Sequence, residues 1–124
     1  MYITGITGNF TCRYGKGTGA LVMLTTRPHN IHRKDIISRK FVFYKELFFV
    51  AGSIKRIDRP QIFFKIYHTC INSRYQCVVK IVRKIFPSFV YKLGSTVRFL
   101  QLGHRELSII RGSRRRICTR RHTF

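Results

Sequence analysis

Short runs of β-branched and aromatic residues, separated by polar or turn residues, constrain this chain more than any other feature. Between residues 36 and 82 the runs of Ile, Val, Phe and Tyr are four to eight residues long, which is typical of strands. Within one run, Ile62, Phe64 and Ile66 occupy every second position, and this period of two turns one side of a strand inward. We therefore expect a mainly β fold, with strands in this region at residues 40–44, 47–57, 62–68 and 75–82.

The two ends of the chain have a different character. Residues 1–34 hold five of the nine glycines and no acid, so we expect a glycine-rich basic arm with one short strand at 10–14. After Pro87, apolar runs at 89–93 and 96–102 flank a Gly-Ser pair, which predicts a hairpin, and a shorter run covers 107–110. Residues 111–124 hold six arginines and no acid, so we expect a basic tail that is disordered without a partner. The expected units are 1–34, 35–86, 87–110 and 111–124.

Charge restricts the partners. The chain has 25 Lys and Arg against four acids, a formal net charge of +21. Because such a charge makes a compact chain repel itself, we expect a polyanion such as nucleic acid or an anionic membrane surface to balance it. A hydrophobic content of 44% argues against a disordered chain. The longest apolar stretch, at 41–51, is interrupted by Lys45 and Glu46 and is shorter than the ~20 residues of a spanning helix, so we expect no membrane span.

Neither the start of the chain nor its cysteines indicate secretion. The sequence MYITGITGNF lacks the pattern of a secretory signal or a clear transit peptide. The cysteines at 12, 70, 77 and 118 lack the CxxC pairs of a persuasive zinc site. We therefore expect reduced thiols, with Cys70 and Cys77 as small buried apolar groups, and no metal within this chain. A metal site shared with a neighbouring chain stays open.

No constellation indicates catalysis. All four acids lie among lysines and arginines, where ion pairing or solvent is the simpler interpretation. A GxSxG elbow is absent, and GKGTG lacks the spacing of a nucleotide-binding loop. We expect no enzyme activity, no cofactor and no small-molecule substrate. The basic residues instead suit the phosphates of folded RNA, and the candidate RNA-binding residues are Arg13, Lys16, Arg33, Lys34, Arg39, Lys40, Lys55, Arg56, Arg74, Arg111, Arg114, Arg115, Arg116, Arg120 and Arg121.

Several segments resemble a ribosomal protein family. GNFTCRYGKG at 8–17 is similar to the GRxTxRHxGGGHK stretch of the universal large-subunit ribosomal protein family "L-two". RKDIISRK at 33–40 and SIKRIDRPQIFFKIY at 53–67 resemble two later segments of that family, and Arg74-Tyr75 falls where the family has its own Arg-Tyr. PSFVYKLGSTV at 87–97 matches the spacing of its PLRNIPVGSTVHN segment. The five blocks occur in the family's order.

The resemblance implies an OB-like β-barrel followed by the opening strands of an SH3-like barrel, bound to large-subunit ribosomal RNA. Its implied partners are ribosomal RNA, neighbouring ribosomal proteins and a second chain that carries the family's missing C-terminal half. The GGG of the first motif is not intact here, and the family's DPNR turn is replaced by Arg59-Pro60-Gln61. Ala occurs only twice and Trp never, a bias typical of organellar genomes. We therefore expect a structural role in a mitochondrial ribosome, with a plastid as the alternative location.

Two other interpretations stay open. Gly94 to Val97 followed by RELS at 105–108 also resembles motifs of the small-subunit ribosomal protein family "S-seventeen", another OB-fold, although this likeness covers only the second half of the chain. A basic non-ribosomal subunit of a membrane-associated complex is the alternative from a different class. Ribosomal RNA contact predicts strong salt dependence and a preference for folded RNA over lipid.

Overall fold

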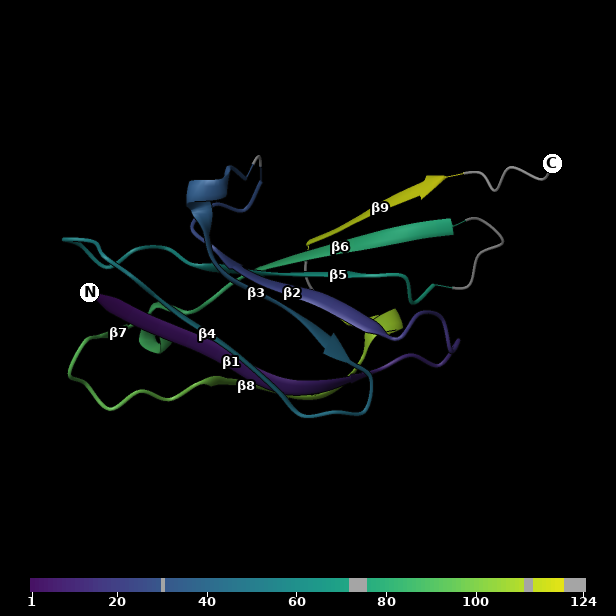
Figure 1. Cartoon of the computed structure of the whole chain (residues 1–124), viewed down its shortest axis with the longest axis horizontal. Helices are drawn as coiled ribbons and strands as arrows, with labels where there is room; N and C mark the ends of the chain where they lie inside the picture. Colours follow the sequence, from purple (N-terminus) through teal and green to yellow (C-terminus); the bar gives the residue numbers. More distant parts are fainter. Residues whose placement is uncertain (30, 72–75, 111–112, 120–124) are drawn as a thin grey trace.

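The computed structural model describes residues 1–29, 31–71, 76–110 and 113–119. This part of the chain forms two β-sheets packed face to face (Figure 1). Sheet A contains β1 (Tyr2–Thr11), β4 (Phe48–Ile54), β7 (Tyr91–Lys92) and β8 (Leu100–Glu106). Sheet B runs in the order β3 (Ile36–Phe43), β2 (Gly19–Thr25), β5 (Phe63–His68), β6 (Gln76–Lys84) and β9 (Ser113–Thr119). Three 3-10 helices complete the described elements: η1 (Arg33–Asp35), η2 (Pro87–Phe89) and η3 (Leu107–Ile109).

The first strand, β1, organises sheet A. One side of β1 pairs antiparallel with β4, and β1 also pairs antiparallel with the short β7 and parallel with β8. The register with β8 shifts between Thr7 and Gly8, which is a bulge-like irregularity. All pairs in sheet B are antiparallel. The mainly β expectation is therefore confirmed, while the OB-like and SH3-like details stay predictions.

A single apolar core fills the space between the sheets. It draws on residues from Ile6 near the N-terminus to Ile110, and includes Phe10 of β1 and Phe48 of β4, whose ring centroids are 4.9 Å apart. The expected alternation in the third run is confirmed, because its every-second-position residues belong to this core. Those buried residues are Ile62, Phe64 and Ile66.

The expectation that residues 1–34 form a loop-like arm is wrong, since β1 and β2 are central strands. The glycines in them permit close approach of neighbouring backbones, although the same glycine content is typical of loops. A Cβ at Gly8 would lie 2.9 Å from the carbonyl oxygen of Gly103 on β8. A Cβ at Gly19 would overlap the carbonyl group of Val42 on β3. Both glycines thus bring neighbouring strands together.

The expected disorder of the basic tail is also wrong over residues 113–119. These residues form β9, which lies at the edge of sheet B beside β6 (Figure 1). Pairing with β6 satisfies backbone groups that would otherwise need solvent. Residues 111–112 and 120–124 of the expected tail lie outside the described residues.

The expectation of reduced thiols is wrong as well. Disulfides join Cys12 to Cys70 and Cys77 to Cys118. Sequence spacing did not indicate these pairs, because strand pairing brings the cysteines together: Cys77 on β6 lies directly opposite Cys118 on β9. The burial expected for Cys70 and Cys77 is confirmed, since they are 0% and 2% exposed.

Strand pairing also corrects the last expected hairpin. The strands expected at 40–44, 47–57, 62–68 and 75–82 correspond to β3, β4, β5 and β6 with shifted ends. The runs at 89–93 and 96–102 yield the short β7 and the later β8, both of which pair with β1. The segment 107–110 contains η3 instead of a strand. Long-range pairing with β1 replaces the local hairpin that the Gly-Ser turn favours.

Candidate polyanion-binding surface

The outer face of sheet B collects basic and aromatic side chains. Phe64 and Ile66 of β5 point into the core, so strand alternation directs Lys65 outward. Strand pairing extends this face across the sheet, because Lys65 lies opposite Met23 on β2 and Val82 on β6. We call the outward set the basic-aromatic face. Its described members are Arg39, Phe41, Phe43, Lys65, Tyr67, Lys80, Lys84 and Arg115.

Two exposed phenylalanines lie at one edge of the face. Phe41 and Phe43 belong to the edge strand β3, and 46% and 53% of their surfaces are exposed. Their rings form an edge-to-face pair with centroids 5.3 Å apart. Exposed rings on a sheet are suitable platforms for stacking of nucleic-acid bases. The cross-strand row that begins here consists of Phe41, Leu21, Tyr67, Lys80 and Arg115.

The centre of the face holds a buried amine without an acceptor. Lys65 is 0% exposed, and it lies between Met23 and Val82, which are buried but do not belong to the core between the sheets. Its Nζ has no hydrogen-bond partner among the described residues. Burial, followed by repulsion from Lys80, lowers the pKa of Lys65 from 10.5 to about 8. Because an unpartnered buried charge is costly, an anion that reached this amine would be stabilising.

Of the sequence-predicted RNA-binding residues, Arg39 and Arg115 belong to this face. Lys40 and Arg116 are exposed, but alternation places them on the opposite side of β3 and β9. Arg114 lies in β9, and its side chain is outside the described part. The predicted residues beyond the described ranges are Arg74, Arg111, Arg120 and Arg121.

A second basic cluster forms around η1 and the loop after β4. Lys34 and Arg56 line a common pocket of about 460 Å³ with Arg27, which is not among the sequence-predicted RNA-binding residues. Arg33 and Lys55 are exposed beside them in the chain. This cluster surrounds a carboxylate, so its positive charge is partly compensated.

That carboxylate, Asp35, is buried and caps η1. Its Oδ2 accepts a hydrogen bond from the backbone N–H of His32 at 2.9 Å, and its Oδ1 accepts one from the hydroxyl of Thr26 at 3.4 Å. The bond from His32 is the largest cause that lowers the pKa of Asp35, and the charge of Arg27 lowers it further against the effect of burial. Asp35 therefore acts as a structural anion inside the second cluster.

The predicted residues Arg13 and Lys16 lie in the turn after β1, where Glu106 holds the turn in place. The backbone N–H of Arg13 donates to Glu106 Oε1 at 2.8 Å, and the hydroxyls of Thr11 and Ser108 each donate to its carboxylate at 3.0 Å. Burial raises the pKa of Glu106, but these hydrogen bonds outweigh it and lower the pKa overall. The side chain of Arg13 donates to Ser108 at 3.0 Å, and Lys16 accepts the Tyr44 hydroxyl through its carbonyl at 2.7 Å.

The carboxylate of Glu106 also belongs to a cluster of potential metal ligands. The sulfurs of Cys12 and Cys70 and a carboxylate oxygen of Glu106 lie within 4.8 Å of one another. The two sulfurs are bonded to each other, so neither is the thiolate that a metal ion requires. In this oxidised state the trio does not fit a metal ion.

Sequence reasoning missed the central members of the face. Lys65 was visible in the alternation pattern, because it is the charged residue among the outward positions of its strand. Phe41 and Phe43 alternate with the buried Val42. This alternation indicates that β3 has an aromatic side that faces away from the core. Lys80 and Lys84 lie two and six positions after Val78 on the outward side of β6. The missing information was which strands lie next to one another.

The fold and this surface define a class: a small, strongly basic β-sandwich with two disulfides and an aromatic-containing cationic sheet face. No known family model and no curated protein matches the chain. Within the described ranges, the structure has no helix with the length and apolar character to cross a membrane.

Proposed function

We propose that this chain is a non-catalytic module that binds a phosphate-bearing polyanion, single-stranded or unpaired RNA, on the basic-aromatic face of sheet B. The observation that carries the proposal is Lys65, a fully buried amine without an acceptor at the centre of that face. A phosphate on this face would compensate the charge of the ammonium, which lies beneath the surface. The surrounding cations would contact further phosphates, and the exposed rings of Phe41 and Phe43 would stack on bases.

A structural role in the large subunit of a mitochondrial ribosome is the most specific form of this proposal. It is supported by the ordered resemblance to the "L-two" family and by the net charge of +21. In this form ribosomal RNA is the ligand, and neighbouring ribosomal proteins cover the remaining surface.

A second candidate function is favoured by the two disulfides. Structural disulfides persist in oxidising compartments and are rare where thiols are kept reduced. A chain that works outside the cell would meet sulfated polysaccharides, whose regularly spaced anions the same cationic face would bind. The aromatic rings discriminate between the ligands, because Phe41 and Phe43 can stack on the planar bases of RNA, whereas a sulfated polysaccharide carries no planar aromatic group.

The test is fluorescence anisotropy with labelled single-stranded RNA and with labelled heparin, using the oxidised full-length chain. The face variant Arg39→Glu with Lys80→Glu is compared with Lys92→Glu and Arg105→Glu, which make the same charge change on exposed positions of sheet A. The plot of the logarithm of the RNA-binding constant against the logarithm of the salt concentration has a slope that reports the number of phosphate contacts. We expect the magnitude of this slope to be lower by about 1.4 in the face variant, at about 0.7 for each lost contact with a single strand. Equal losses in both variants would contradict a defined face.

A second comparison separates the ligands. Replacing Phe41 and Phe43 together by Ser removes two exposed rings and leaves the charge unchanged. We expect RNA affinity to fall at least tenfold, since stacking contributes about 1–3 kcal/mol per base, while heparin affinity stays the same. If this variant keeps its RNA affinity and the wild-type chain binds heparin more tightly than RNA, the extracellular alternative is favoured.

A further inference from the structure

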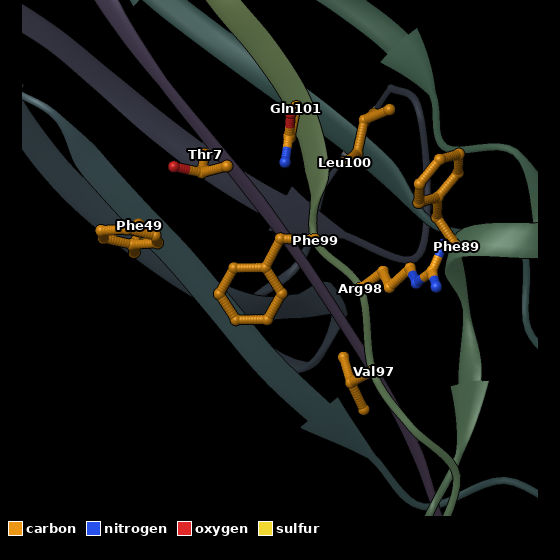
Figure 2. Close-up of a pocket in the computed structure, with 8 residues that line it drawn as sticks. All are labelled: Thr7, Phe49, Phe89, Val97, Arg98, Phe99, Leu100 and Gln101. Atoms are coloured by element: carbon orange, nitrogen blue, oxygen red, sulfur yellow. The ribbon is translucent and has the colours of Figure 1, made fainter.

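We propose that the outer face of sheet A carries a separate binding site for a small amphiphilic carboxylate. A pocket of about 610 Å³ opens on this face between β1, β4 and the segment that leads into β8 (Figure 2). The core separates it from the basic-aromatic face, which is the outer surface of the other sheet. Its size falls within the range of small-molecule sites.

Aromatic rings form the walls of the pocket. Phe49 of β4 and Phe99 lie with ring centroids 6.2 Å apart, and Figure 2 shows the ring of Phe99 between Phe49 and Phe89. Phe49 is 52% exposed, so a large apolar surface is left in contact with water. Covering it is favourable, because apolar surface is removed from water.

The strand beneath is built to let this ring lie close. A Cβ at Gly5 of β1 would come within 2.9 Å of two ring carbons of Phe99. Any larger residue would lift the ring away from the sheet and fill the pocket from below. Gly5 thus sets the depth of the pocket, which is a packing role and not a matter of backbone freedom.

A single cation determines the class of ligand. Among the described residues that line the pocket, Arg98 alone is charged. Figure 2 shows its side chain reaching toward Phe89 at the edge of the pocket. A guanidinium binds a carboxylate with two parallel hydrogen bonds, and apolar walls suit a hydrocarbon body. One cation on an apolar wall complements a monoanion with an apolar tail, whereas a polyanionic chain would find no further charges here.

The probe is dodecanoate below its micellar concentration, titrated into the full-length chain by calorimetry, with dodecanol as the uncharged match. Arg98→Met is compared with Arg105→Met, an exposed arginine on β8 outside the pocket. We expect Arg98→Met to weaken dodecanoate binding at least tenfold and to leave dodecanol binding unchanged, while Arg105→Met changes neither. Equal dodecanoate affinity in wild type and Arg98→Met would overturn the proposal.

A second variant tests the apolar wall. Phe49→Ser alters a half-exposed side chain on an edge strand, so the fold is retained, which circular dichroism checks. We expect it to weaken dodecanoate and dodecanol by similar factors. Dodecanoate binding that appears only with phosphatidylcholine vesicles, and not with the monomeric probe, would also overturn the proposal. Because Arg98 and Phe49 lie away from sheet B, failure here leaves the RNA proposal unaffected, and RNA binding by both variants checks this independence.

Discussion

Cys12 and Cys70 are joined by a disulfide that connects the end of β1 in sheet A to the segment after β5 in sheet B. The bond therefore ties the two sheets of the sandwich together at one end. The second disulfide, Cys77–Cys118, lies within sheet B and fastens its edge strand β9. In a chain with a net charge of +21, two covalent links oppose the self-repulsion of the compact state.

Removal of the Cys12–Cys70 bond should destabilise the protein markedly. The bond spans 58 residues, and closing a loop of this size in the unfolded chain is worth about 4 kcal/mol in the chain-entropy model. Urea denaturation of Cys12→Ser with Cys70→Ser, against wild type, measures the loss. Mass spectrometry of unreduced peptides should show the two pairs, and four free thiols in the folded, air-exposed protein would contradict the account.

Lys65 should make the protein more stable as pH rises above 8. Its pKa is about 8 in the folded chain and 10.5 in the reference state. Between these values the unfolded chain holds a proton that the folded chain has lost, so the free energy of unfolding increases with pH. Lys65→Met removes this dependence and should be more stable than wild type at pH 7, because no buried charge remains.

The measurement is urea denaturation of both proteins at pH 7, 8, 9 and 10. The other lysines titrate in both proteins, so the difference between the two curves isolates Lys65. It should be largest at pH 7 and shrink toward pH 10. A constant difference would show that the amine is not the source of the pH dependence.

Glu106 should support stability on the acid side. Its pKa is lowered in the folded state, so its contribution is complete above the ordinary carboxyl pKa of 4.5 and is lost as pH falls through the folded pKa. The free energy of unfolding of Glu106→Gln should be about 1–3 kcal/mol lower than that of wild type at pH 7, because charged hydrogen bonds are lost. On acidification the variant should lose less stability than wild type, since it lacks the titrating carboxylate. Glu46→Gln, at an exposed position, is the control and should change little.

Gly8 should not tolerate a side chain. A Cβ there would lie 2.9 Å from the Gly103 carbonyl oxygen, and neither backbone can move without disturbing the β1–β8 pairing. Gly8→Ala should destabilise the protein by about 1–3 kcal/mol, measured by urea denaturation. Ser53→Ala, at an exposed position of β4, is a matched strand control. Equal stability of Gly8→Ala and wild type would show that the two strands are farther apart than described.

The sequence predicts the features that depend on local pattern. It does not predict the features that depend on which distant strands pair with one another. The alternation at Ile62, Phe64 and Ile66 correctly indicates a half-buried strand. The loop expected over β1 is wrong, because a glycine that allows close strand approach and a glycine that allows a turn cannot be distinguished in a sequence. The cysteine pairs and the row that joins Phe41 to Arg115 depend on strand order, which short-range patterns do not contain.

The most direct test of the proposed function is to locate the RNA on the protein. Ultraviolet cross-linking of the oxidised chain to uridine-rich single-stranded RNA, followed by mass spectrometry of the peptides, identifies the contacted residues. We predict cross-links at Phe41, Phe43 and Tyr67 that disappear when Arg39 and Lys80 are changed to Glu. Cross-links confined to residues 27–34 and 55–60, around the second basic cluster, would contradict it.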